Sequence, residues 1–355
     1  MTTRRTGVLT ALITTAALFL CLPGLLRSLT PADSNRMHES LRPPRLRTLT
    51  VRLLPGETED RKLISQLCTV FEKTNPGVRI FLRSVDAEEF LSPSAVLPDA
   101  ALYETGSLNI PEKVFLPLAG ETESSGMFSG VSYAVPLWLS PNVLSIPVSW
   151  LQEAHSATPR PDSLLAASTA QPAKEMQAML ENAFLPWDRL AQPGAIASPR
   201  GVALSQLLSM CPYPLRKQLP DAVQTHEHSI CARVQTLGRH LSSVRKGENL
   251  IPCVLEPAVS DHVRYVSLCR DSEDARAFVH FLRTGLTEEA LALGLIPLRE
   301  EIISADPLVQ QAVSLFQRSH TLPNAFAHTR QELESLCLQG FQSLTDPVET
   351  LLRLR

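Results

Sequence analysis

The stretch VSLCRDSEDARAFVHFL, at residues 266–282, decides the fold of this chain. It opens on a short β-branched run, passes through a polar turn, and continues with apolar residues at helical spacing. That spacing places Ala275, Phe278 and Leu282 on one face of a helix. Ser272 stands just before them, where its side chain can accept a hydrogen bond from a free amide of the first turn. The stretch therefore predicts a strand, a turn and an amphipathic helix.

A second unit of this kind lies near the start of the globular part. Residues 48–54 are rich in β-branched and aliphatic side chains and predict a strand, and residues 57–73 have the period of an amphipathic helix. The breaker Asn75-Pro76-Gly77 ends that helix, and residues 78–83 predict a second strand. A strand, a helix and a strand within so short a span predict a βαβ unit with parallel pairing.

The other expected elements are a short strand after Pro98 and a mostly helical middle, from about residue 150 to 250. The segments with the clearest helical spacing in the rest of the chain are 173–185, 226–246, 287–293, 306–316 and 331–352.

Five motifs, read in order, resemble the extracellular solute-binding proteins, the substrate receptors of ABC importers. They are FEKTNPGV at 71–78, PDA at 98–100, YAVPL at 133–137, the return segment at 266–282, and GLIPLR at 294–299. The resemblance covers roughly residues 48–320 and is weak between 150 and 250.

The resemblance implies an α/β chain with a two-lobed, periplasmic-binding-protein-like fold of type II, each lobe a sheet flanked by helices. Lobe 1 would hold residues 48–136 and 263–300, and lobe 2 would hold 137–262 and 301–355. The chain length agrees, because 355 residues exceed what a single core usually holds. Two chain crossings, near 137–147 and 258–265, would serve as a hinge.

The function implied is that of an extracytoplasmic receptor. It would bind a carbohydrate or another small polar solute between its lobes and deliver it to ABC permease membrane subunits. A second class stays open: a non-transporting, membrane-anchored structural or sensory module that keeps the fold. The low aromatic content, 5% with three Trp and four Tyr, favours this alternative, because it does not suffice for a broad sugar-stacking platform.

Export is expected from the N-terminus. Arg4 and Arg5 precede an uncharged apolar run up to residue 26, so residues 1–29 are expected to be a signal peptide or signal anchor. Three fates remain open: retention as a membrane anchor, lipidation at Cys21, and cleavage. Residues 30–47 form a basic, Pro-containing linker.

Composition and motifs argue against several other classes. The net charge of −3 gives no reason to expect nucleic acid as a partner. Phosphate-loop, zinc-peptidase and serine-hydrolase signatures are missing from the sequence, so no enzyme activity, catalytic residue or cofactor is expected. His226 and His228 stand two apart and point away from each other on a helix. Capping of that helix by Thr225 accounts for the cluster, and no metal site is expected.

Candidate ligand-binding residues follow from topology, since ligands of open parallel sheets lie outside the carboxyl ends of the strands. Flat apolar rings suit the C–H faces of a sugar and carboxylates suit its hydroxyls. Each candidate also has a structural explanation, as a core ring or a solvated charge. In chain order the candidates are Glu57, Thr58, Tyr103, Glu104, Trp138, Trp187, His262 and Tyr265.

Overall fold

A computed structural model describes most of the chain from residue 46 onward. The described residues are 46–56, 58–118, 124–150, 185–197, 199–224, 231–256, 259–285, 287–298, 302–303, 309–310, 313–314, 324–346 and 349–350. The expected signal segment, Cys21 and most of the linker lie outside these residues. Residues 48–355 form one compact unit.

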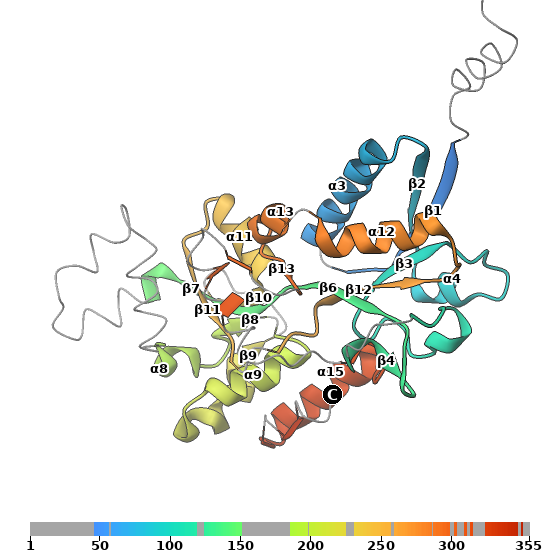
Figure 1. Cartoon of the computed structure of the whole chain (residues 1–355). Helices are drawn as coiled ribbons and strands as arrows, with labels where there is room; N and C mark the ends of the chain where they lie inside the picture. The colour runs from blue at the N-terminus through green and yellow to red at the C-terminus, as the bar shows by residue number, and fades with distance from the viewer. Residues whose placement is uncertain are drawn as a thin grey trace, which may run out of the picture. The chain divides into compact units, whose positions relative to one another are not determined.

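A six-stranded sheet forms the first lobe, with the strand order β13-β6-β12-β3-β1-β2 (Figure 1). Its strands are β1 (Arg47–Leu53), β2 (Val78–Ser84), β3 (Ala100–Glu104), β6 (Val135–Leu139), β12 (Val263–Leu268) and β13 (Ile296–Pro297). The central strand β3 pairs parallel to β1 and antiparallel to β12, the return strand. The expected strands near 48–54, 78–83 and 100–104 are confirmed.

Two amphipathic helices lie against this sheet, α3 (Thr58–Thr74) and α12 (Glu273–Thr284) (Figure 1). They also contact each other, with the Phe71 and Phe278 rings edge to face at a centroid distance of 5.2 Å. The Ser272 side chain accepts from the Ala275 amide at 3.1 Å, which confirms the predicted cap. The smaller elements of this part are α4 (Ala87–Leu91), η1 (Pro111–Lys113), η2 (Ser124–Gly126), β4 (Met127–Phe128), β5 (Val131–Ser132) and α13 (Thr287–Ala292).

A five-stranded sheet forms the second lobe, in the order β11-β7-β10-β8-β9. Its strands are β7 (Asn142–Pro147), β8 (Ile196–Ala197), β9 (Val223–Gln224), β10 (Ala232–Thr236) and β11 (Leu250–Val254). The helices that follow these strands or close the chain are α8 (Trp187–Leu190), α9 (Val202–Met210), η3 (Tyr213–Gln218), α10 (Leu219–Ala222), α11 (Leu237–Arg245) and α15 (Arg330–Gln342).

The expected single helix over 226–246 is wrong. Residues 225–230 lie outside the described part, and the next residues form β10, which pairs with β7 and β8. Ala232, Val234 and Thr236 are all buried, at the period of two that a strand requires. Thr236 then caps α11 by accepting from the Arg239 amide. Sheet pairing therefore overrode a helical pattern that holds only from Leu237 onward.

Two chain crossings between the sheets lie side by side. The first passes from β6 to β7 through Ser140 and Pro141, and the second leads from β11 to β12. The Ser140 amide donates to the His262 carbonyl at 2.9 Å, and the Ser260 hydroxyl donates to the Ser140 carbonyl at 2.6 Å. The predicted lobe boundaries as a whole include undescribed residues and stay a prediction.

A third connection comes from the C-terminal part. The helix α15 packs on α9 of the second lobe. At the first residue of α15, the amide of Arg330 donates to the carbonyl of Gly106 in the first lobe at 2.9 Å, and the amide of Gly106 donates to the carbonyl of Ala325. The start of α15 is therefore fixed against the loop that follows β3.

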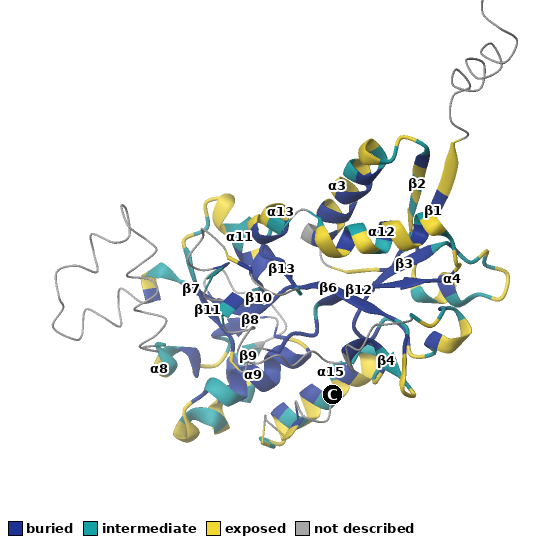
Figure 2. Ribbon diagram, viewed as in Figure 1, coloured by how far each residue is buried: buried dark blue, intermediate teal, exposed yellow. Residues whose placement is uncertain are grey.

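Burial is concentrated in the central strands. Every residue of β3, β6 and β12 is buried, as expected for strands covered on both faces (Figure 2). Cysteines contribute to these cores as free thiols: Cys68, Cys211, Cys231, Cys253, Cys269 and Cys337. In the described part of the chain, no helix has the length and apolar character needed to cross a bilayer.

Candidate functional site

A cavity of about 600 Å³ opens at the carboxyl ends of β1 and β3. This is the place where ligands bind in open α/β sheets. Both lobes contribute to the wall, because α11, which carries Arg239, packs on β7, β10 and β11 of the second sheet. The lining residues are Leu54, Pro55 and Gly56 after β1, Ala87 and Leu91 of α4, Glu104 and 106–109 after β3, Arg239, and Thr329, Arg330 and Gln331 at the start of α15.

A buried ion network stands directly behind this wall. Arg264 of β12 is 2% exposed, and its guanidinium donates to the Asp60 carboxylate of α3. The Trp138 indole donates to the other Asp60 oxygen at 2.6 Å. On its other side, the Arg264 guanidinium lies 3.5 Å from a Glu104 carboxylate oxygen. Arg264 therefore joins a carboxylate inside the core to one that faces the cavity.

Glu104 remains ionised in this setting. Burial by itself would raise its pKa, but the neighbouring His262 and the positive charges of Arg264 and Arg330 lower that pKa to about 2. The Arg330 guanidinium lies 3.2 Å from the Glu104 carboxylate. Glu104 is therefore a fixed negative charge with cations on more than one side.

Two neighbouring groups have shifted pKa values as well. Burial raises the pKa of Asp60 to about 6, and the positive charge of Arg264 opposes this shift. Burial would lower the pKa of His262, but the negative charges of Asp261 and Glu104 raise it above 6.5. The His262 ring lies 3.7 Å from Glu104 and 3.8 Å from Asp261. Charge in this region is thus set by contacts between side chains, and solvent has little access to it.

A glycine makes room for this network at the end of β1. A Cβ atom at Gly56 would overlap the Arg264 Nη2 atom and would lie 2.5 Å from the Glu104 carboxylate. Any side chain there must displace the guanidinium that joins the two carboxylates. The pair Pro55-Gly56 therefore ends the strand and also admits Arg264.

Substitution of Gly56 with alanine should destabilise the protein by about 1–3 kcal/mol, the usual range for overpacking. The matched control is Gly77→Ala, because a Cβ at Gly77 meets no atom within 4 Å. That control should be neutral or slightly stabilising, since alanine restricts the unfolded chain. Urea unfolding of both variants tests the prediction. Equal midpoints for the two would contradict it.

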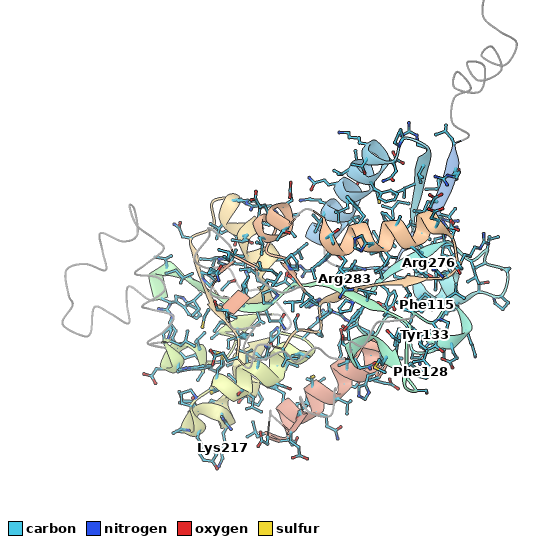
Figure 3. The ribbon with its side chains drawn as sticks, in the orientation of Figure 1. Phe115, Phe128, Tyr133, Lys217, Arg276 and Arg283 are labelled. Carbon is cyan, nitrogen blue, oxygen red and sulfur yellow. The ribbon has the colours of Figure 1, made fainter. Side chains whose placement is uncertain are left out.

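The predicted aromatic ligand-binding residues are in the core. Tyr103 and Tyr265 are each 0% exposed and Trp138 is 3% exposed. The Tyr103 hydroxyl shares a 2.6 Å hydrogen bond with the Ser267 hydroxyl, and its ring stacks on Phe115 at 5.2 Å. Phe115, with Phe128 and Tyr133 near it, is labelled in Figure 3. These rings do not line the cavity in this structure.

The other predicted residues lie partly at the cavity and partly away from it. Glu104 lines the cavity and His262 lies beside it, whereas Trp187 begins α8 and packs against the core of the second lobe. Thr58 begins α3, and Glu57 lies outside the described residues, as do His226 and His228. The ligand-binding role of all eight residues stays a prediction.

Sequence reasoning missed Arg239, Arg330, Asp60 and Arg264. One signal was present, because Arg264 interrupts the apolar strand VRYVSL and a charge in such a strand needs a buried partner. No feature of the neighbouring sequence marks Arg239 or Arg330 as a residue of the cavity wall, since each lies in the first turn of an ordinary polar helix.

A buried histidine of the second lobe predicts loss of stability in acid. His240 of α11 is 2% exposed, shares a 2.9 Å hydrogen bond with Ser145, and has a pKa lowered by burial from 6.5 to about 4. Because the folded pKa lies below the unfolded value, its contribution is complete above pH 6.5 and is lost as the pH falls toward 4. The expected loss between pH 7.5 and 5 is about 2 kcal/mol.

Urea unfolding of wild type and His240→Asn at both pH values measures this loss. The raised pKa of Asp60 has the opposite effect, because it increases the free energy of unfolding as the pH falls. This effect is common to both proteins and cancels in the difference between them. The same pH dependence in the two proteins would show that His240 does not carry the effect.

Comparison with known proteins shows which solved structures have a similar fold. No family model matches the chain, and no curated protein sequence matches it. Among solved structures, the galacto-N-biose/lacto-N-biose I-binding protein of the ABC transporter from Bifidobacterium longum aligns with a TM-score of 0.50 and 11% identity. The alignment covers 87% of this chain and 95% of that one.

The GacH receptor of Streptomyces glaucescens aligns with a TM-score of 0.48 and 12% identity, over 87% of this chain and 97% of that one. At identities of 11% and 12%, these likenesses concern the fold alone. With two sheets, flanking helices and paired crossings, the chain has the two-lobed type II fold of the extracellular solute-binding proteins.

Proposed function

We propose that this chain is the extracytoplasmic solute-binding receptor of an ABC importer, with a carbohydrate or another small polar solute as its ligand. One observation carries the proposal: a cavity at the carboxyl ends of β1 and β3 has polar and charged groups from both lobes in its wall. Its volume of about 600 Å³ falls within the range of small-molecule sites. The fold neighbour from Bifidobacterium longum, in complex with lacto-N-biose, supports the assignment.

The mechanism follows from the origin of the lining residues. Glu104 belongs to the first lobe, Arg239 to the second, and Arg330 to the segment that contacts both. A solute that touches all three gains contacts when the lobes close, and this difference between states stabilises the closed form. The closed receptor would then dock on membrane permease subunits, and its N-terminal segment would hold it at the membrane.

Thermal unfolding in the presence of candidate solutes tests the proposal. A ligand that binds the folded state stabilises it by RT ln(1 + [L]/Kd), about 2.7 kcal/mol at one hundred times Kd. Sugars, sugar acids, peptides, polyamines and inorganic anions should include at least one compound that raises the midpoint with rising concentration. An unchanged midpoint across all these classes would reject the receptor assignment.

A second candidate function is the non-transporting, membrane-anchored module. Its specific support is that none of the described lining residues carries an aromatic ring. The described part of the wall then offers no ring that could stack on a sugar, and a chain that has given up ligand binding would show the same feature. The module predicts no ligand response in the thermal screen, the result opposite to that expected for the receptor.

A further inference from the structure

Residues 324–330 connect the two lobes at the cavity, and we call this segment the strap. It leads directly into α15, which packs on α9 of the second lobe. Residues 106–109 of the first lobe and residues 329–331 line the same cavity. The contact between the strap and the first lobe is therefore part of the cavity wall.

Hydrogen bonds hold the beginning of the strap on the first lobe. The Ala325 amide donates to the Ser125 carbonyl at 2.8 Å, and the Ala325 carbonyl accepts from the Gly106 amide at 3.2 Å. The Asn324 side-chain amide donates to the Met127 carbonyl at 2.8 Å. Both backbone polar groups of Ala325 are thus bonded to the first lobe.

A buried aromatic ring strengthens this attachment. Phe326 is 2% exposed, and its ring centroid lies 6.0 Å from that of Tyr103, 6.4 Å from that of Phe115 and 6.4 Å from that of Phe128. Phe115 and Phe128 are labelled in Figure 3. Burial of apolar surface therefore anchors the strap in addition to its hydrogen bonds.

The other end of the strap is fixed to the second lobe through α15. Leu333 and Cys337 of this helix pack in one apolar cluster with Val202 of α9, and Phe341 joins the core of the second lobe. A capping box satisfies the first turn of α15, so the helix is regular from its beginning. The helix moves with the second lobe.

Little slack remains between the two attachments. Only residues 327–329 separate Phe326 from the first residue of α15, Arg330, whose amide donates to the Gly106 carbonyl at 2.9 Å. A helix has a fixed length, because each of its residues adds about 1.5 Å. The second lobe therefore cannot move away from Gly106 unless the strap leaves the first lobe or α15 leaves α9.

Gly106 permits this close approach. Its φ is +74°, and a Cβ atom there would lie 2.8 Å from the Arg330 nitrogen and 3.1 Å from the His328 carbonyl oxygen. Both are backbone atoms, which cannot rotate away as the end of a flexible side chain can. Any other residue at this position would push the strap off the first lobe.

We propose that the strap limits how far the two lobes can separate, so that the cavity keeps its width when no solute is bound. The bonds between Gly106 and the strap hold the wall where both lobes meet. A cavity that is already formed needs less ordering when a ligand binds. The inference concerns the solute-free protein and applies equally to a receptor and to a non-transporting module.

Distances between spin labels on the two lobes of the full chain test this proposal. The labels are attached after Arg276→Cys on α12 and Lys217→Cys on η3, two exposed positions that are labelled in Figure 3. Pulsed electron paramagnetic resonance on the solute-free protein should give one narrow distance distribution. The chain without these two substitutions reports any reaction of its native thiols, which are buried in the described part.

Replacement of Gly106 with alanine in the labelled protein should shift the distribution to longer distances and broaden it. The matched control is Gly247→Ala, in the turn after α11. Gly247 has a φ of +92°, and a Cβ there meets no atom within 4 Å. This control therefore has the same left-handed backbone strain without a contact to the strap, and it should keep the wild-type distribution.

Solute-free urea unfolding shows whether each variant is folded. If Gly106→Ala does not fold, Asn324→Ala takes its place. That variant loses the side-chain hydrogen bonds to the Met127 carbonyl and from the Phe326 amide. It should produce a smaller shift in the same direction, and an unchanged distribution would then overturn the proposal.

Three other results would also overturn it. They are a broad distribution in the wild type, a wild-type distribution in folded Gly106→Ala, and equal shifts in the two glycine variants. None of these results bears on the receptor function, which the thermal screen with candidate solutes tests separately.

Discussion

Replacement of Arg264 with methionine is expected to lower the free energy of unfolding by about 3–5 kcal/mol, the usual cost of removing one partner from a buried ion pair. Arg264 is 2% exposed and lies between Asp60, 2% exposed, and Glu104, 5% exposed. Without the guanidinium, Asp60 must be buried as an unpaired carboxylate or take up a proton. Urea unfolding at neutral pH measures the loss.

Two further variants serve as controls for this prediction. Arg276→Met removes an arginine from the exposed pair with Asp271 and should change stability by no more than about 0.5 kcal/mol. The double variant Asp60→Leu/Arg264→Met replaces both charges with apolar groups and should lose less than the sum of its single variants. Additive losses would show that the two side chains do not stabilise each other.

Truncation of Phe278 to alanine is expected to cost about 3–5 kcal/mol, as for other buried aromatic residues. The side chain is 0% exposed and packs edge to face on Phe71 of α3, so it joins α12 to α3 over the first sheet. The cavity left behind cannot collapse easily, because the backbones of both helices are fixed by their own hydrogen bonds. The midpoint of urea unfolding should fall accordingly.

The control is the same substitution at an exposed phenylalanine. Phe81 on the edge strand β2 is 56% exposed, and Phe81→Ala should cost less than about 1 kcal/mol. A loss for Phe278→Ala no larger than that for Phe81→Ala would mean that the α3–α12 contact contributes little to stability.

The sequence by itself determined four of the six strands of the first sheet, β1, β2, β3 and β12, and the two helices packed on it, α3 and α12. Ser272, Phe278 and Leu282 specify the cap and the buried face of α12 through interactions within a few residues, and these do not depend on the rest of the fold. The βαβ pattern at residues 48–83 is local in the same sense. The two-lobed fold, expected from five short motifs, agrees with the structure for this reason.

The sequence also showed which residues lie at the end of a strand, but it did not show to which face of the sheet each side chain points. Tyr103 and Glu104 are neighbours on β3, and successive strand residues point to opposite faces. Glu104 reaches the cavity, whereas Tyr103 enters the core. Sequence reasoning placed both at the strand end and could not tell which of them would face the solute.

Only the tertiary structure decided how the second lobe pairs and which residues surround the cavity. Ala232–Thr236 became strand β10 because two neighbouring strands offer it hydrogen bonds, a contribution that no helical period within the segment can reveal. Glu104, Arg239 and Arg330 lie far apart in sequence and meet because the lobes and the start of α15 converge. A pattern of neighbouring residues records local propensity, whereas the groups that surround the cavity depend on contacts between distant segments.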